Sequence, residues 1–163
     1  SSFFAGLSGI DRTGKAVESA DYNADGTVSY AEAHAFAKVD GETTDWPVST
    51  VEVWLQKQAE QDEIAKIFAQ PMEDLIAQAE PHRQYVVRSL SAQLSLDLNR
   101  PYSSQMPPLD FESIIGAYWV RLGMELIIFA MVQQIQQSDQ AALKLVLEQI
   151  ANCENGSLPI SQY

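Results

Sequence analysis

Residues 21–32 read DYNADGTVSYAE, a run in which oxygen-bearing side chains recur at alternate positions. Side chains two apart along a tightly turned loop can all point inward, so this alternation predicts a ring of oxygen donors. Gly26, at the sixth position, permits a left-handed backbone that a side chain would penalise. Glu32, at the twelfth, lies in the run AEAHAFAKV at 31–39, whose alanines predict a helix leaving the loop.

The ligand that this pattern predicts is Ca²⁺, a hard cation that takes roughly six to eight oxygens. We expect side-chain oxygens from the first, third and fifth positions and a backbone carbonyl from the seventh. The ninth position usually acts through a water, and the twelfth closes the site with two carboxylate oxygens. The predicted metal site is therefore Asp21, Asn23, Asp25, Thr27, Ser29 and Glu32.

A second interpretation of the same residues needs no metal. Ser29 and Glu32 have the spacing of a capping box, in which the glutamate accepts a hydrogen bond from the serine amide. A turn rich in Asp and Asn followed by such a cap would leave a similar sequence. The completeness of the pattern favours the calcium loop over this alternative.

The loop and its outgoing helix resemble an EF-hand. That resemblance implies an incoming helix and a second loop, paired through the eighth residue of each. The stretch 9–20, GIDRTGKAVESA, is a poor helix, so the incoming helix is either degenerate or displaced to 2–9. The sequence contains no second loop of this pattern. Val28 should therefore point into the core and pair with the extended segment 45–50 or with another copy of the protein.

A further resemblance covers about the first 50 residues, through FFAGLSG, ADYNADGTVSYAEAHAFA and DWPVST. These runs are similar to segments of bacterial proteins that have a caspase-like cysteine peptidase domain, in which a calcium loop lies downstream of the catalytic cysteine. The resemblance implies a C-terminal part of something larger, and the start at Ser1 rather than Met favours a processed product or a piece of a longer protein. No catalytic motif of such a domain occurs here, so no catalytic residue is assigned.

The rest of the sequence predicts a mainly α fold, with the calcium loop packed on a bundle of about five helices. We expect residues 1–45 to form the calcium-binding segment and 46–163 the bundle, together as one compact domain. The stretch 99–110, NRPYSSQMPPLD, predicts a loop. The predicted helices are 50–69, one that starts at Pro71, 81–98, 111–135 and 139–152.

The helix at 111–135, which we expect Asp110 to cap, is apolar nearly all round from 114 to 132, which is long enough to span a membrane. Arg121 and Glu125 lie in its middle, where two charges would be costly in a bilayer. We therefore predict a central buried helix rather than a membrane span. Because the two residues are four apart on one face, we expect them to form a buried or half-buried ion pair.

The composition of the sequence limits the kinds of partner and metal that the protein can bind. The formal net charge is −12 and no run of Lys or Arg occurs, which excludes a nucleic-acid partner. The single cysteine, Cys153, is expected to be free and packed. His34 and His82 share no ligand spacing, so we predict no zinc site, and His82 should be exposed at a helix start. The tryptophans Trp46, Trp54 and Trp119 are expected in the core.

Three hypotheses for function follow. The favoured one is a structural calcium module, because cooperative sensing usually uses paired loops; its dissociation constant would be on the order of 10⁻⁴–10⁻³ M. The second is a calcium-responsive module that exposes an apolar groove to a protein partner or to a second copy, as a homodimer. The third is a fragment of an enzyme whose chemistry lies outside these residues, and we expect no enzyme activity from this chain alone.

Overall fold

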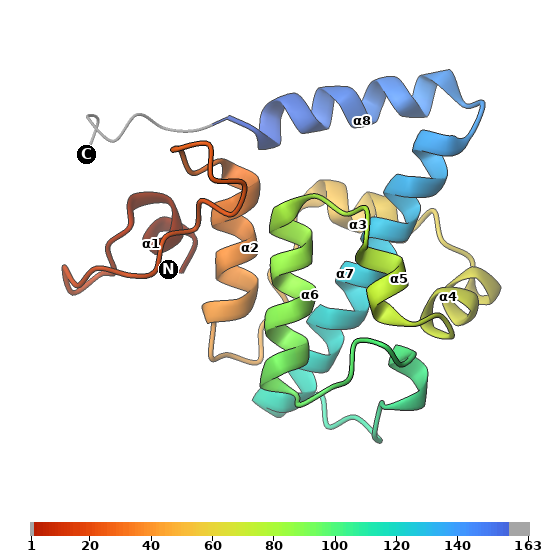
Figure 1. Cartoon of the computed structure of the whole chain (residues 1–163), viewed down its shortest axis with the longest axis horizontal. Coiled ribbons are helices and arrows are strands. Elements are labelled where there is room, and N and C mark those ends of the chain that lie inside the picture. Colours follow the sequence, from red (N-terminus) through yellow and green to blue (C-terminus); the bar gives the residue numbers. More distant parts are fainter. Residues whose placement is uncertain (1, 157–163) are drawn as a thin grey trace.

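The computed structural model describes residues 2–156 and is mainly α, as predicted (Figure 1). No strand occurs in this part of the chain, where the only bridges are two isolated antiparallel ones. The helical elements are α1 (Ser2–Ser8), α2 (Tyr30–Asp40), α3 (Thr50–Gln56), α4 (Gln61–Phe68), α5 (Met72–Ile76), α6 (Pro81–Gln93), the short 3₁₀ turn η1 (Tyr102–Ser104), α7 (Ile114–Gln137) and α8 (Ala141–Glu154).

Helix α7 is the centre of the molecule, which confirms the predicted buried helix. Leu122, Leu126 and Ile128 on it are at most 1% exposed. The hydroxyl of Ser113 caps this helix by accepting a hydrogen bond from the amide of Gly116 at 2.9 Å, so the expected cap at Asp110 is wrong. Among the described helices, α7 alone is long and apolar enough to cross a membrane, and 78% of its most apolar window is buried in the protein.

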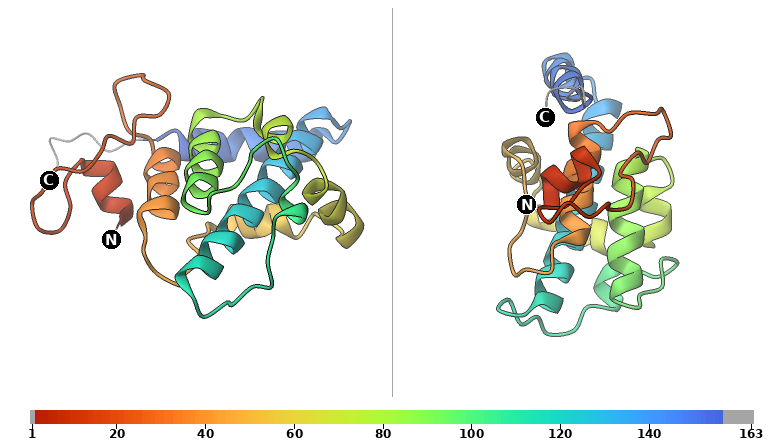
Figure 2. Two further views of the ribbon diagram at one scale, coloured as in Figure 1. Left: turned by 60° about the horizontal axis from the view of Figure 1, so that its bottom comes forward. Right: turned by 90° about the vertical axis from the view of Figure 1, so that its left-hand side faces the viewer.

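The other described helices pack against α7 or against its neighbours. Helices α3, α4, α5 and α6 contact α7, while α2 packs against α6 and contributes Ala35 and Val39 to the main core. Helix α8 lies across one end of α2 and α7, and α1 lies on the outer side of α2 (Figures 1 and 2). The segment that carries the candidate loop is therefore joined to the bundle through α2.

The predicted helix at 50–69 is two helices, so the described part of the bundle has six helices, α3 to α8, where about five were expected. Each of the two begins with its own capping box. In α3, Ser49 and Glu52 satisfy each other's amides, and in α4 the carboxylate of Glu63 accepts from the amide of Glu60 at 3.0 Å. A new cap inside an amphipathic run ends the first helix and starts a second, at a place where hydrophobic spacing alone predicts continuity.

Several side-chain predictions are corrected. Trp119 is buried at 5% exposure and Trp54 is partly buried against the core, as expected, but Trp46 is 46% exposed. Cys153 is free, as expected, but exposed rather than packed, because no residue of α8 is buried. The side chain of His82 is 13% exposed, so the predicted exposure at the helix start is also wrong.

Candidate metal centre

The loop at 21–29 has no helical residue and leads directly into α2. Gly26 has φ 88°, the left-handed conformation predicted for the sixth position. Ala24 shares this region with φ 57°, which a residue with a β-carbon adopts at some cost. These two residues turn the backbone tightly enough for the side chains on either side to reach the loop's own amides.

The carboxylates of Asp21 and Asp25 accept hydrogen bonds from other residues of the loop. The two carboxylate oxygens of Asp21 accept from the amides of Asp25 at 3.1 Å and Gly26 at 2.9 Å. The carboxylate of Asp25 accepts from the hydroxyl and the backbone amide of Thr27, at 2.8 and 2.9 Å. It also accepts from the side-chain amide of Asn23 at 3.0 Å. These hydrogen bonds, first that of the Thr27 hydroxyl, lower the pKa of Asp25 below its ordinary value, so it is ionised at neutral pH.

Glu32 joins the two ends of the loop. One of its carboxylate oxygens accepts from the amides of Tyr22 and Asn23, at 2.9 and 3.1 Å. The other accepts from the amide and the hydroxyl of Ser29, both at 2.9 Å, while the Ser29 hydroxyl accepts from the Glu32 amide. This residue is only 3% exposed. The predicted capping box is therefore present, and the same carboxylate also reaches the start of the loop.

The donor set suits a calcium ion better than a transition metal. All side chains at the predicted ligand positions offer oxygen, and Ca²⁺ prefers carboxylate and carbonyl oxygens. However, no three His, Cys, Asp or Glu side chains in residues 2–156 are gathered closely enough to hold a metal. The carboxylates face the loop's amides instead, because three like charges would repel one another at a shared centre.

The incoming side of the loop follows one of the two predicted alternatives. A helix, α1, occupies the upstream position 2–8, and residues 9–20 form an irregular connection with a bridge between Ile10 and Ala16. Val28 points inward, as expected, and packs against a small cluster of Ala5, Ala20 and Phe36.

The predicted pairing of the loop with 45–50 is wrong. No backbone hydrogen bond joins Val28 to that described segment. The amide of Tyr30, two residues further on, donates instead to the carbonyl of Gly156 at 2.9 Å. This contact places the end of α8 against the start of α2.

A stacked aromatic pair connects the loop to the bundle. The ring of Tyr22, the second loop residue, lies on the ring of Tyr85 in α6, with centroids 3.9 Å apart and planes 17° apart. Burial raises the pKa of Tyr22 well above its ordinary value, so the phenol stays neutral. The contact joins the loop to a helix that lies about 60 residues later in the chain.

A buried ion network lies beside α2. The ammonium of Lys38 contacts the carboxylates of Glu52 and Glu125, and Arg83 contacts Glu125 at 3.0 Å. All four side chains are at most 8% exposed. His34 also binds Glu52, at 2.9 Å. Two positive and two negative residues from α2, α3, α6 and α7 thus neutralise each other, which is the arrangement that buried charges require.

Arg121 does not pair with Glu125, so that prediction is wrong. Its guanidinium donates to backbone carbonyls at 2.8–3.0 Å, and it thereby holds the connection between α2 and α3 against α7. The accepting carbonyls belong to Lys38, Gly41, Thr43 and Asp45. Sequence reasoning missed these acceptors because backbone carbonyls leave no side-chain pattern.

His82 lies at the edge of the ion network. Burial, followed by the positive charge of Arg83, lowers the pKa of His82 to about 4, so the ring is neutral at pH 7. Its nearest carboxylate is Glu80, at 3.5 Å. His34 and His82, which share no spacing in sequence, line the same small cavity beside Lys38.

No protein-family model, no curated protein and no solved structure matches this chain. The fold defines a mainly α protein in which a loop rich in side-chain oxygens, residues 21–29, precedes α2.

Proposed function

We propose that the chain is a calcium-binding helical protein in which Ca²⁺ mainly stabilises structure, through an EF-hand-like loop. The observation that supports this most is the position of Glu32, whose carboxylate reaches both ends of the loop from the first turn of α2. The residues that would hold the ion are Asp21, Asn23, Asp25, Thr27, Ser29 and Glu32.

The stabilising effect would follow from charge and from the position of α2. Asp21, Asp25 and Glu32 place three carboxylates in one loop, and a dication offsets their mutual repulsion. Glu32 lies on the same helix as Lys38, which is tied to Glu125 at 2.6 Å in the core. An ion bound by Glu32 would therefore also stabilise α2, the helix that carries Lys38 of the buried ion network.

The affinity should be modest. Three acidic ligands and no matching second loop suit a dissociation constant on the order of 10⁻⁴–10⁻³ M, as in extracellular modules. Such a site would be filled where calcium is millimolar.

Isothermal titration calorimetry of Ca²⁺ with Glu32→Gln tests the proposal. We expect at least about tenfold weaker binding in this variant, because the closing bidentate ligand is lost. Glu63→Gln is the matched control, since Glu63 occupies the same capping-box position in α4, away from the loop. Equal calcium binding by Glu32→Gln and the unmodified protein, or no binding at all, would overturn the assignment.

The Tyr22–Tyr85 contact also supports the second hypothesis, a calcium-responsive interaction module. A change in the loop would reach α6 through this stacked pair, whose centroids are 3.9 Å apart. Calcium-dependent exposure of apolar surface would appear as increased fluorescence of an apolar dye, or as a change in oligomer size. Identical dye binding and size with EDTA and with calcium count against this function and leave the structural one.

A further inference from the structure

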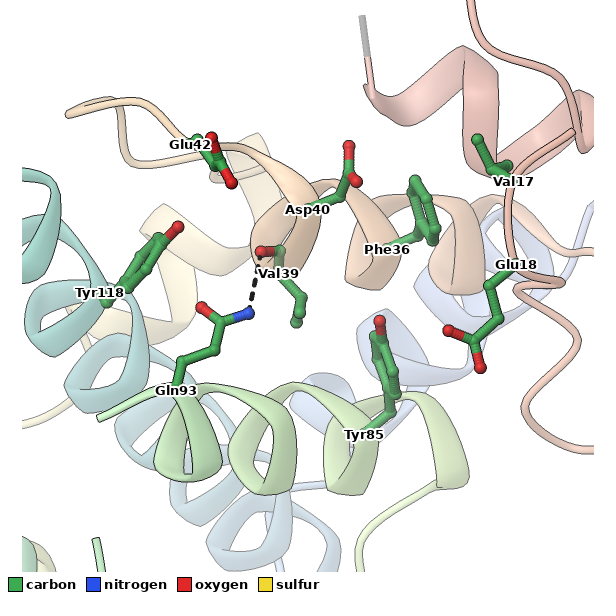
Figure 3. Close-up of a pocket in the computed structure, with 9 residues that line it drawn as sticks. All are labelled: Val17, Glu18, Phe36, Val39, Asp40, Glu42, Tyr85, Gln93 and Tyr118. Carbon is green, nitrogen blue, oxygen red and sulfur yellow. Dashed lines mark hydrogen bonds between the residues drawn. The ribbon is translucent and has the colours of Figure 1, made fainter. Parts of the chain in front are cut away.

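A groove of about 690 Å³ lies between α2, α6 and the segment that precedes the loop. Figure 3 shows Tyr85 rising from α6 toward Phe36 of α2, with Tyr118 of α7 at one end and Glu18 at the other. Small-molecule sites typically have volumes of roughly 300–1,000 Å³. None of the predicted calcium ligands lines this groove, so it is a separate site.

Among the described residues, three aromatic rings line the groove, those of Phe36, Tyr85 and Tyr118. Phe36 and Tyr118 are 5% and 8% exposed, and Tyr22 stacks on Tyr85, so all three rings are held by their neighbours. The face of an aromatic ring attracts cations. Tyr118 is already engaged in such a contact, since the guanidinium carbon of Arg121 lies 5.3 Å from its ring centroid, so a bound cation would use the ring of Tyr85.

Every charged side chain among the described residues that line the groove is acidic. These residues are Glu18, Asp40 and Glu42. All three are exposed, and none forms an ion pair with another described residue. Their mutual repulsion favours a positive occupant. Because these carboxylates are not gathered into a metal-holding group, the aromatic walls favour an organic cation over a metal ion.

We propose that this groove binds a small organic cation of the alkylammonium class. The half-buried ring of Tyr85 contacts the alkyl groups and attracts the positive charge, Phe36 and Tyr118 form the closed walls, and the carboxylates supply the opposite charge. The two features are complementary, because neither a neutral apolar molecule nor an inorganic ion would use both. Binding at this groove does not require calcium in the loop.

Titration with choline, followed by calorimetry in EDTA, tests the proposal. We expect saturable binding with a dissociation constant on the order of 1 mM, as suits so small a ligand. The neutral isostere 3,3-dimethylbutan-1-ol, which replaces the ammonium nitrogen with carbon, should bind far more weakly. Equal affinity for the two compounds, or no saturable binding of choline, would overturn the proposal.

Variants locate the binding to this groove. Tyr85→Leu should raise the dissociation constant for choline by about 5-fold to 30-fold, the effect of losing a desolvated cation–π contact. Glu18→Gln, at an exposed position that should not disturb folding, should raise it about threefold. Glu112→Gln removes an exposed carboxylate that does not line the groove and should leave binding unchanged. Equal effects of Glu18→Gln and Glu112→Gln would contradict a site in this groove.

Discussion

The ring of Tyr22 lies stacked on the ring of Tyr85, with centroids 3.9 Å apart and planes inclined by 17°. Tyr22 is the second residue of the candidate loop and Tyr85 belongs to α6, so this contact joins the loop to the bundle directly. The second connection is covalent, through Glu32 and α2. The loop is thus attached at both its start and its end.

The stacked pair should show measurable coupling. In a double-mutant cycle with Tyr22→Leu and Tyr85→Leu, we expect an interaction free energy of about 0.5–1.5 kcal/mol, the usual value for a packed aromatic pair. Urea denaturation of the four proteins, in EDTA, measures it. Additive losses of stability would mean that the two rings contribute independently and do not couple the loop to α6.

The buried ion network makes Glu125 a sensitive position. Glu125→Gln leaves Lys38 and Arg83 buried without this counter-charge, and we expect a loss of about 3–5 kcal/mol of unfolding free energy. Glu73→Gln is the matched control, because Glu73 pairs with Arg88 on the surface and should contribute less than about 1 kcal/mol. Similar destabilisation by both variants, measured by denaturant unfolding, would contradict the network's role.

Arg121 should not be replaceable by lysine. Arg121→Lys keeps the charge but loses the planar group that donates to four backbone carbonyls, and we expect a loss of roughly 2–4 kcal/mol. The accepting connection between α2 and α3 should also become more open. Amide hydrogen exchange at residues 41–46 measures this. Unchanged protection there, with unchanged stability, contradicts the assigned contact.

His82 should make the protein sensitive to acid. Its pKa of about 4 in the folded protein lies below the ordinary 6.5, so the unfolded chain takes up the proton first. Stability therefore falls as the pH drops from 6.5 toward about 4, by at most about 3 kcal/mol from this residue.

His82→Gln removes this source of acid sensitivity. The difference in unfolding free energy between variant and unmodified protein, measured by denaturation at several pH values, should grow in the variant's favour between pH 6.5 and about 4. A difference that stays constant across this range would show that His82 is not a buried neutral ring. Comparing the two proteins cancels the carboxylates that titrate in the same range.

The helical class and the central helix could be predicted because both depend on local patterns. The apolar residues of α7 lie on all of its faces, so the helix has to be buried. Pro71 and Pro81 mark helix starts that the structure confirms. The backbone turn of the loop could also be predicted from local sequence, since Gly26 has the predicted left-handed conformation. The six-residue calcium site itself remains a proposal, because it depends on an ion.

The buried network could not be predicted because its partners are distant in sequence. Lys38 and Glu125 are 87 positions apart, and no periodicity links them. The spacing of Arg121 and Glu125 suggested a local pair, but each has other partners elsewhere in the fold. The predictions of side-chain exposure for Trp46 and His82 were wrong for a related reason. Whether either side chain is covered depends on which distant helix packs against it.

Thermal unfolding in EDTA and in 10 mM Ca²⁺ tests the central claim most directly. With a dissociation constant on the order of 10⁻⁴–10⁻³ M, calcium at about 10 mM should raise the melting temperature by roughly 3–10 °C. Glu32→Gln should abolish most of that rise, while Glu63→Gln retains it. An unchanged melting temperature of the unmodified protein in calcium would contradict a structural calcium site in the loop at 21–32.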